Sequence, residues 1–166
     1  MKAKGSLIAL LIVLIWCQPI QAQCPELNGF RPAQPGQGEK KPILLVDSLE
    51  GNALYSLVPS YEDSGRAKDL CVALFTEKEG DLIASSRTNL KGEFSFQGQV
   101  PGRYRLIALS KAMGELNILV ELKENPAKEQ SQQQRLLLHM RLKNSSSGKS
   151  YATLLSVKEY QEREKL

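Results

Sequence analysis

Few residues in this sequence could carry out catalysis, because the chain contains one histidine, His139. A catalytic zinc site is usually built from two or three imidazoles. A Ser-His-Asp triad would have to use His139, and the sequence lacks the G-x-S-x-G turn that exposes a nucleophilic serine. We therefore predict a non-catalytic chain with no cofactor and no metal, in which His139 is exposed on the polar side of a strand. The remaining enzymatic hypothesis is a small hydrolase that pairs His139 with a loop carboxylate, Asp63 or Glu62.

The cysteines predict a cross-link rather than a metal site. Of the three, Cys17 lies in the apolar start of the chain, which leaves Cys24 and Cys71, too few for a cysteine-rich zinc site. Two cysteines in an oxidising compartment favour a disulfide. The chain-entropy estimate for closing so long a loop is about 4 kcal/mol. In the alternative, Cys71 is a small buried residue and Cys24 is a free thiol.

Charged and aromatic side chains offer two possible binding surfaces. Four arginines fall on predicted outward-facing strand positions and could form a weak site for anions, or simply a solvated sheet face that discourages edge pairing: Arg103, Arg105, Arg135 and Arg141. Three tyrosines could stack on sugar, or could be ordinary loop residues: Tyr55, Tyr61 and Tyr151. The tripeptide Asn144-Ser145-Ser146 fits an N-glycosylation acceptor, which would matter only in a secretory eukaryote.

The first 22 residues resemble a secretory signal. Lys2 and Lys4 precede an apolar run over 7–16, and Ala22 ends a plausible cleavage region. That run is too short to span a bilayer as a helix, so we predict cleavage after about Ala22, a secreted or periplasmic protein, and no other membrane contact. Loss of both lysines leaves 20 basic residues against 18 acidic ones, a net charge of about +2, which argues against a nucleic-acid partner.

The remaining chain predicts an arm followed by strands. Residues 23–41 are rich in Pro and Gly and predict a linker or a loosely docked arm. Short apolar or alternating segments predict strands at 43–46, 53–58, 70–76, 82–87, 92–97, 103–109, 116–122, 135–143 and 151–157. Glu50-Gly51-Asn52 predicts a turn that joins the first two strands into a hairpin. Residues 159–166 form a charged tail.

The central segment, 70–109, has the clearest pattern. Phe94 and Phe96 alternate with polar neighbours, which is typical of a strand with one buried face. Asn89 and Gly92 predict the preceding turn, and Pro101-Gly102 predicts a bend before the next strand. Short strands at this spacing predict a β-sandwich.

This segment, T-N-L-K-G-E-F-S-F followed by V-P-G-R-Y-R-L, resembles the carboxypeptidase regulatory-like domain, a transthyretin-like sandwich. Eight positions carry the resemblance: Thr88, Gly92, Phe94, Phe96, Pro101, Gly102, Tyr104 and Leu106. The resemblance implies a single antiparallel, all-β sandwich of about seven to nine strands over residues 42–158, transthyretin-like or immunoglobulin-like. Some transthyretin-like folds are histidine-dependent enzymes, and the single histidine separates this chain from them.

From these features we expect an exported β-sandwich module for protein interaction, or for a structural role in an envelope or extracellular assembly. The partner, a protein or a glycan, stays open. Carbohydrate binding through exposed tyrosines is the main alternative. A collagen-adhesin-like stalk with an internal Lys–Asn cross-link is a weaker one.

Overall fold

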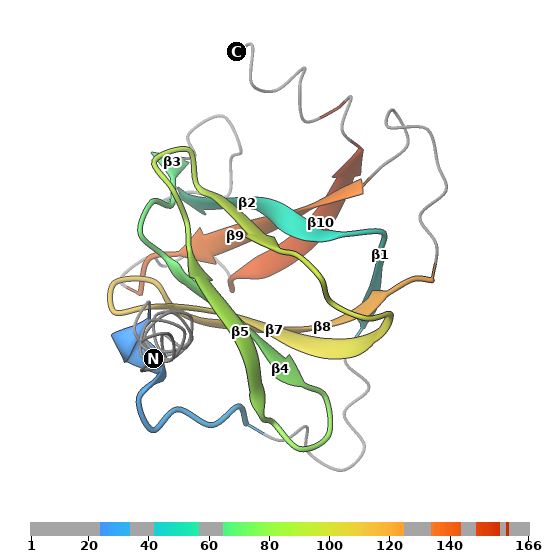
Figure 1. Ribbon diagram of the computed structural model, residues 1–166. Coiled ribbons are helices and arrows are strands. Elements are labelled where there is room, and N and C mark those ends of the chain that lie inside the picture. Colours follow the sequence, from blue (N-terminus) through green and yellow to red (C-terminus); the bar gives the residue numbers. More distant parts are fainter. Residues whose placement is uncertain are drawn as a thin grey trace, which may run out of the picture.

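The described part of the chain, in a computed structural model, is an all-β sandwich of two mixed five-stranded sheets (Figure 1). The structure describes residues 24–33, 42–56, 65–124, 134–143, 149–156 and 159. The strands are β1 (Ile43–Val46), β2 (Leu49–Ser56), β3 (Gly65–Arg66), β4 (Cys71–Thr76), β5 (Leu82–Arg87), β6 (Glu93–Phe96), β7 (Gly102–Ser110), β8 (Gly114–Leu122), β9 (Gln134–Arg141) and β10 (Tyr151–Ser156). The predicted fold class, an all-β sandwich, is confirmed.

The two sheets divide the strands by position rather than by chain order. Sheet A has the order β1-β8-β7-β4-β5. Sheet B has the order β10-β9-β2-β3, and β6 also pairs with β2. Neither sheet is purely antiparallel as predicted, because β1 runs parallel to β8 and β2 runs parallel to β9.

The predicted hairpin between the first two strands is wrong. Val46 ends β1 in sheet A and Leu49 begins β2 in sheet B, so the short link between them crosses from one sheet to the other. Glu50-Gly51-Asn52 lies inside β2 rather than in a turn. Gly51 is there because of a close backbone approach: a Cβ at this position would lie 2.1 Å from the carbonyl oxygen of Leu136. A glycine within a strand can mark such an approach as well as a turn.

The main core lies between the sheets. It includes large, fully buried side chains from both of them, among which are Val72, Leu74, Leu106, Val120, Leu136, Leu138 and Met140. The aromatic side chains of Phe94 and Phe96 join this core from β6, and Tyr104 joins it from β7. The alternation predicted for 92–97 and 103–109 therefore points the expected residues inward.

The amino-terminal arm, residues 24–33, covers the outer face of sheet A. It begins with a short 3-10 helix, Pro25–Leu27, and buries Cys24 and Leu27 against Ala73, Phe75 and Ile107. Phe30 packs on Phe75 with ring centroids 6.0 Å apart. Figure 1 shows this blue segment beside β4 and β5. The arm is thus a packed element over its described length, not a loose linker.

The turns of the central segment are as predicted. Asn89 Oδ1 accepts hydrogen bonds from the backbone N–H groups of Lys91 and Glu93, at 2.8 and 3.0 Å. Gly92 has a φ of 74°, and a Cβ there would lie 2.5 Å from the carbonyl oxygen of Ala53. Position 92 therefore favours glycine for two independent reasons.

Several predictions concern residues that the structure does not describe. These are the signal peptide at 1–22, Tyr61, Glu62 and Asp63, the glycosylation tripeptide at 144–146, and the tail apart from Glu159. Among the residues that are described, no helix has the length and apolar character needed to cross a membrane.

Candidate functional site

The candidate site is an open pocket of about 340 Å³ at one end of the sandwich. Three segments of the chain meet there: the β1–β2 link that crosses between the sheets, the β6–β7 loop, and the end of β8. The lining residues are Asp47, Ser48, Leu49, Glu50, Ser95, Phe96, Gln97, Gly98, Gln99, Pro101, Leu122 and Lys123. The pocket forms where the chain changes sheet, because no strand continues there to fill the space.

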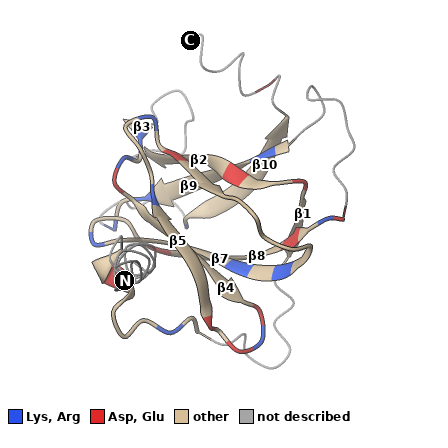
Figure 2. Ribbon diagram, in the orientation of Figure 1, with Lys and Arg blue, Asp and Glu red and all other residues tan. Residues whose placement is uncertain are grey.

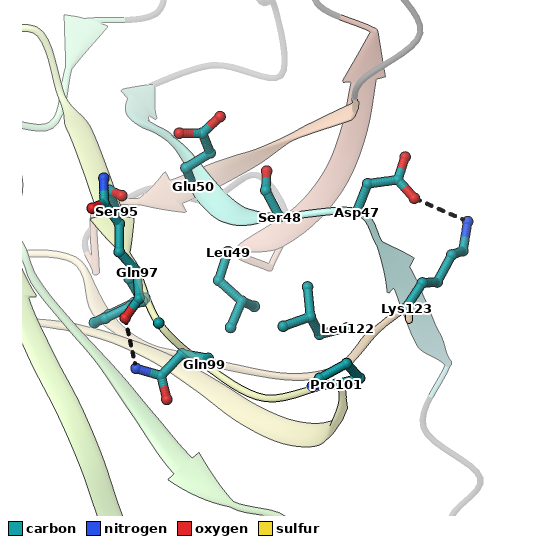
Figure 3. Close-up of a pocket in the computed structure, with 12 residues that line it drawn as sticks. Asp47, Ser48, Leu49, Glu50, Ser95, Gln97, Gln99, Pro101, Leu122 and Lys123 are labelled. Atoms are coloured by element: carbon teal, nitrogen blue, oxygen red, sulfur yellow. Dashed lines mark hydrogen bonds and ion pairs between the residues drawn. The ribbon is translucent and has the colours of Figure 1, made fainter. Parts of the chain in front are cut away.

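The pocket combines an apolar floor with a polar rim. Figure 3 shows Leu49 and Leu122 side by side near its centre, with Pro101 and Gln99 beside them. Hydroxyl, amide and carboxylate groups of Ser48, Glu50, Ser95, Gln97 and Gln99 surround this floor. Such a lining can hold a ligand that has both an apolar surface and hydrogen-bonding groups.

Asp47 is the most unusual group of the pocket. Its side chain is only 4% exposed, and Oδ1 lies 3.5 Å from Nζ of Lys123. Oδ2 is buried, and no hydrogen-bond partner for it occurs within the described residues. Native proteins rarely leave a buried carboxylate oxygen unpaired, so such an atom needs a specific explanation.

The surrounding backbone fixes Asp47 and Lys123 next to each other. Val46 pairs with Leu122 in the parallel β1–β8 ladder. One residue beyond β8, the N–H of Lys123 donates to the carbonyl oxygen of Val46 at 3.0 Å. The ion pair therefore depends on a parallel register between strands about 75 residues apart in the sequence.

Tyr104 anchors the loop that forms the other side of the pocket. Its hydroxyl donates a hydrogen bond to the carbonyl oxygen of Val100, in the loop between β6 and β7. Burial raises the pKa of Tyr104, so the hydroxyl stays protonated at neutral pH and can donate this hydrogen bond. Within the same loop, Nε2 of Gln99 donates to the carbonyl oxygen of Gln97 at 3.2 Å.

The predicted cysteine pair is confirmed. The sulfur atoms of Cys24 and Cys71 are at bonding distance, with their Cα atoms 5.6 Å apart, which lies in the usual range for a disulfide.

Next to Cys24 in the sequence region of the arm, Glu26 forms an ion pair with Arg87, with a distance of 2.6 Å between their charged atoms. This contact lowers the pKa of Glu26 and raises that of Arg87, mainly through their shared hydrogen bond. Cys24, Glu26 and Cys71 also form the one metal-like grouping found among the described residues, but the disulfide and Arg87 already occupy its donor atoms.

The four arginines do not form one surface. Arg103 is exposed and binds Glu121 at 2.8 Å. Arg105 was predicted to face solvent, but the arm covers it and it is 3% exposed. Arg135 and Arg141 lie near opposite ends of β9, in the other sheet, and Arg141 is buried instead of exposed. In Figure 2, basic and acidic residues are spread over both sheets and their loops.

His139 was also predicted to be exposed, and it is 4% exposed instead. Its ring stacks on Tyr151 of the neighbouring strand, with centroids 4.6 Å apart and planes 7° from parallel. Tyr55 and Tyr151 are partly exposed as expected. They do not line one groove, because Tyr151 is opposite His139, which is opposite Leu54, so that Tyr55 points to the other side of sheet B.

The eight residues of the sequence resemblance are mainly structural. Thr88 is buried, accepts a hydrogen bond from the N–H of Leu70 at 2.9 Å and donates one to the carbonyl oxygen of Ala67. Phe94, Phe96, Tyr104 and Leu106 are buried in the main core. Two members, Phe96 and Pro101, also line the pocket.

Sequence reasoning missed the polar residues of the pocket, above all Asp47 and Lys123. Each directly follows an apolar strand, at Val46 and Leu122, which would have marked both as strand-end residues. Nothing in the spacing shows that these two ends meet. Comparison with models of known protein families, and with curated proteins, gives no match for this chain.

Proposed function

We propose that this chain is an exported, non-catalytic β-sandwich module that binds its partner through the pocket at the β1–β2 link. The single observation that supports this most directly is the open pocket of about 340 Å³, with an apolar floor and a polar rim built by separate segments of the chain.

Export is supported by the disulfide between Cys24 and Cys71. A disulfide is compatible with an extracellular or periplasmic location, since cytosolic reductants keep most thiols reduced. Together with the signal-like sequence at 1–22, this supports cleavage after about Ala22 and release of a mature chain. A role in an envelope or extracellular assembly follows from that location.

Membership in the carboxypeptidase regulatory-like family is part of the proposal. The turn at Gly92, the inward-facing pair Phe94 and Phe96, and the buried Tyr104 have the structural roles that the resemblance implies. A non-catalytic role is supported by the single histidine of the sequence. That residue is buried and stacked on Tyr151, so its imidazole is poorly placed to reach a substrate.

The test is affinity capture from a native extracellular or envelope fraction. The bait is the oxidised, exported chain, compared with the double variant Gln97→Ala/Gln99→Ala, which alters the rim of the pocket. The matched control is Glu79→Ala/Asp81→Ala in the β4–β5 turn, on residues that do not line the pocket. We expect one ligand or partner to be retained by the wild type and the control, and lost by the rim variant.

Equal capture by all three proteins would show that the pocket is not the binding surface. The captured molecule is then incubated with fresh protein and its mass is measured again. An unchanged mass supports a binding module, whereas conversion would contradict the non-catalytic assignment. Sequencing the start of the exported chain tests cleavage after Ala22 in the same preparation.

A further inference from the structure

We propose that Cys24, Glu26 and Cys71 bind a zinc ion when the disulfide is reduced, and that the metal then holds the arm on sheet A. By residue count alone, two cysteines are too few for a cysteine-rich zinc site. The fold adds a third donor, because the carboxylate of Glu26 lies beside both sulfur atoms. This inference goes beyond the proposed function and does not depend on the pocket.

The first step of the argument is the distance between the three donors. The two sulfur atoms and a carboxylate oxygen of Glu26 all lie within 4.8 Å of one another. In a tetrahedral site with Zn–S bonds of about 2.3 Å, the ligand atoms are roughly 3.5–3.8 Å apart. The Cα atoms of Cys24 and Cys71, 5.6 Å apart, leave room for that spacing after small rotations of the side chains. The donors are therefore close to the positions that a zinc ion requires.

The second step is the chemistry of the donors. Zinc binds both thiolates and carboxylates, and thiolate ligands favour zinc over magnesium or calcium. Both cysteines are fully buried, whereas the Glu26 side chain is 25% exposed. Three protein ligands leave one position of the metal for a water molecule, on the exposed side of Glu26. The donor set thus fits one four-coordinate zinc ion.

The third step concerns Arg87, which binds Glu26 at 2.6 Å in the oxidised chain. Arg87 also contacts the carboxylate of Asp69 at 3.2 Å and its carbonyl oxygen at 2.7 Å. Glu26 can therefore turn to a metal while Arg87 keeps a partner. Two thiolates and one carboxylate around a divalent ion leave one negative charge, which the adjacent guanidinium offsets. The same guanidinium favours the thiolate form that zinc requires.

The change from disulfide to zinc site conserves atoms and electrons. A dithiol reductant supplies two electrons and two protons, which break the S–S bond and leave two thiols. Zinc then displaces both thiol protons and forms two Zn–S bonds. Either link joins the same two cysteines, which are separated by 47 residues in the sequence. The arm therefore stays docked before the disulfide has formed and after it has been reduced.

The experiment is an anaerobic metal titration of the exported chain, after reduction with a phosphine that is then removed. Every sample carries Cys17→Ser, so that Cys24 and Cys71 supply all the thiols. The probes are zinc, measured by competition with a chelating dye, and cobalt(II), whose thiolate charge-transfer absorption reports sulfur ligands. We expect the reduced chain to bind one metal ion with this absorption, and the oxidised chain to bind none. Slow amide hydrogen exchange at Leu27 and Phe30, lost on reduction, should return when zinc is added.

Two variants test the carboxylate ligand. Glu26→Gln should weaken zinc binding about a hundredfold, because even residues that only support a metal ligand contribute about ten- to a hundredfold. The matched control is Asp69→Asn, which removes another carboxylate from Arg87 but no metal donor, and should leave zinc affinity unchanged. Both variants keep the disulfide, so circular dichroism of the oxidised proteins verifies their fold before reduction.

Several results would overturn the inference. Zinc binding that is equally tight in the oxidised and reduced chains would place the metal elsewhere. No metal binding, cobalt binding without thiolate absorption, or equal affinities of the wild type and Glu26→Gln would each exclude this ligand set. If zinc bound but Leu27 and Phe30 still exchanged as fast as in the metal-free reduced chain, the metal would not hold the arm. None of these results bears on capture through the pocket, so the proposed function is tested separately.

Discussion

Two buried charges in this molecule, Arg105 under the arm and Asp47 at the pocket, are satisfied to very different degrees. The guanidinium of Arg105 donates to the carbonyl oxygens of Glu77 and Ala33, at 2.9 and 2.6 Å. Asp47 has one ion pair at 3.5 Å and one oxygen without a partner among the described residues. A buried charge with good partners helps to hold a structure together, whereas one left partly unpaired contributes less to stability.

The two regions also differ in the interactions that hold their segments in place. The arm is held on sheet A by the disulfide, by Glu26 with Arg87, and by Arg105. The pocket is bordered by loops with few cross-links, of which Tyr104 to Val100 is one. We therefore expect substitutions in the arm region to reduce stability and substitutions in the pocket to reduce binding.

The largest expected effect is that of removing the disulfide. The variant Cys24→Ser/Cys71→Ser releases a loop with a sequence separation of 47 residues, and should lose about 4 kcal/mol of unfolding free energy. Urea denaturation of oxidised wild type and variant measures the difference. Equal midpoints and slopes would mean that the disulfide contributes nothing to stability.

The next effect is expected for Arg105→Met, which leaves the carbonyl oxygens of Glu77 and Ala33 without their donor. We expect a loss of about 2–3 kcal/mol, and faster amide hydrogen exchange at Leu27 and Phe30 in the arm. The matched control is Arg103→Met, on the same strand but exposed and paired with Glu121, which should lose much less. If the two variants were equally destabilised, Arg105 would not be the buried contact described here.

Tyr104→Phe removes the hydroxyl that holds Val100 in the β6–β7 loop. The expected loss is about 1 kcal/mol, together with changed amide shifts at Gln97 and Gln99 on the pocket rim. Tyr151→Phe is the control, because that side chain is partly exposed and stacks through its ring. A loss in stability without any change at the rim would place Tyr104 in the core alone.

A smaller effect is expected from acid, through Glu26. Arg87 lowers the pKa of Glu26 in the folded chain below its usual value of 4.5. The ion pair therefore contributes its full stabilisation above the unfolded pKa and loses it as pH falls through the folded one. Unfolding measured from pH 7 to pH 3 should show this loss in the wild type and a reduced pH dependence in Glu26→Gln. Identical profiles would exclude Glu26 as a source of acid sensitivity.

The smallest change in stability is expected for Asp47→Asn. The substitution removes a buried, half-paired carboxylate, and Lys123 is 38% exposed and can turn to water. The unfolding free energy should stay within about 0.5 kcal/mol of the wild type. A loss as large as that of Arg105→Met would mean that Asp47 is structural, and would remove the contrast between the two regions.

Local patterns predicted much of the fold. Alternation identified the strand positions, and turn residues identified the connections at Asn89–Gly92 and between β4 and β5. The errors came from interactions between distant segments. Gly51 predicts a turn by its residue type, but its real role is to allow the close approach of the Leu136 backbone from another strand. Arg105 and His139 were assigned to solvent by alternation, which does not reveal that the arm covers one and that Tyr151 stacks on the other.

The sequence by itself determined the fold class, the central turns and the cysteine pair, because each depends on short-range patterning or on the number of residues of one type. Only the tertiary structure decided the pocket. Asp47 and Lys123 meet through a parallel pairing of β1 with β8, and the two loops around them belong to different connections. Which strands pair in parallel depends on how both sheets close around the core, and no local segment encodes that choice.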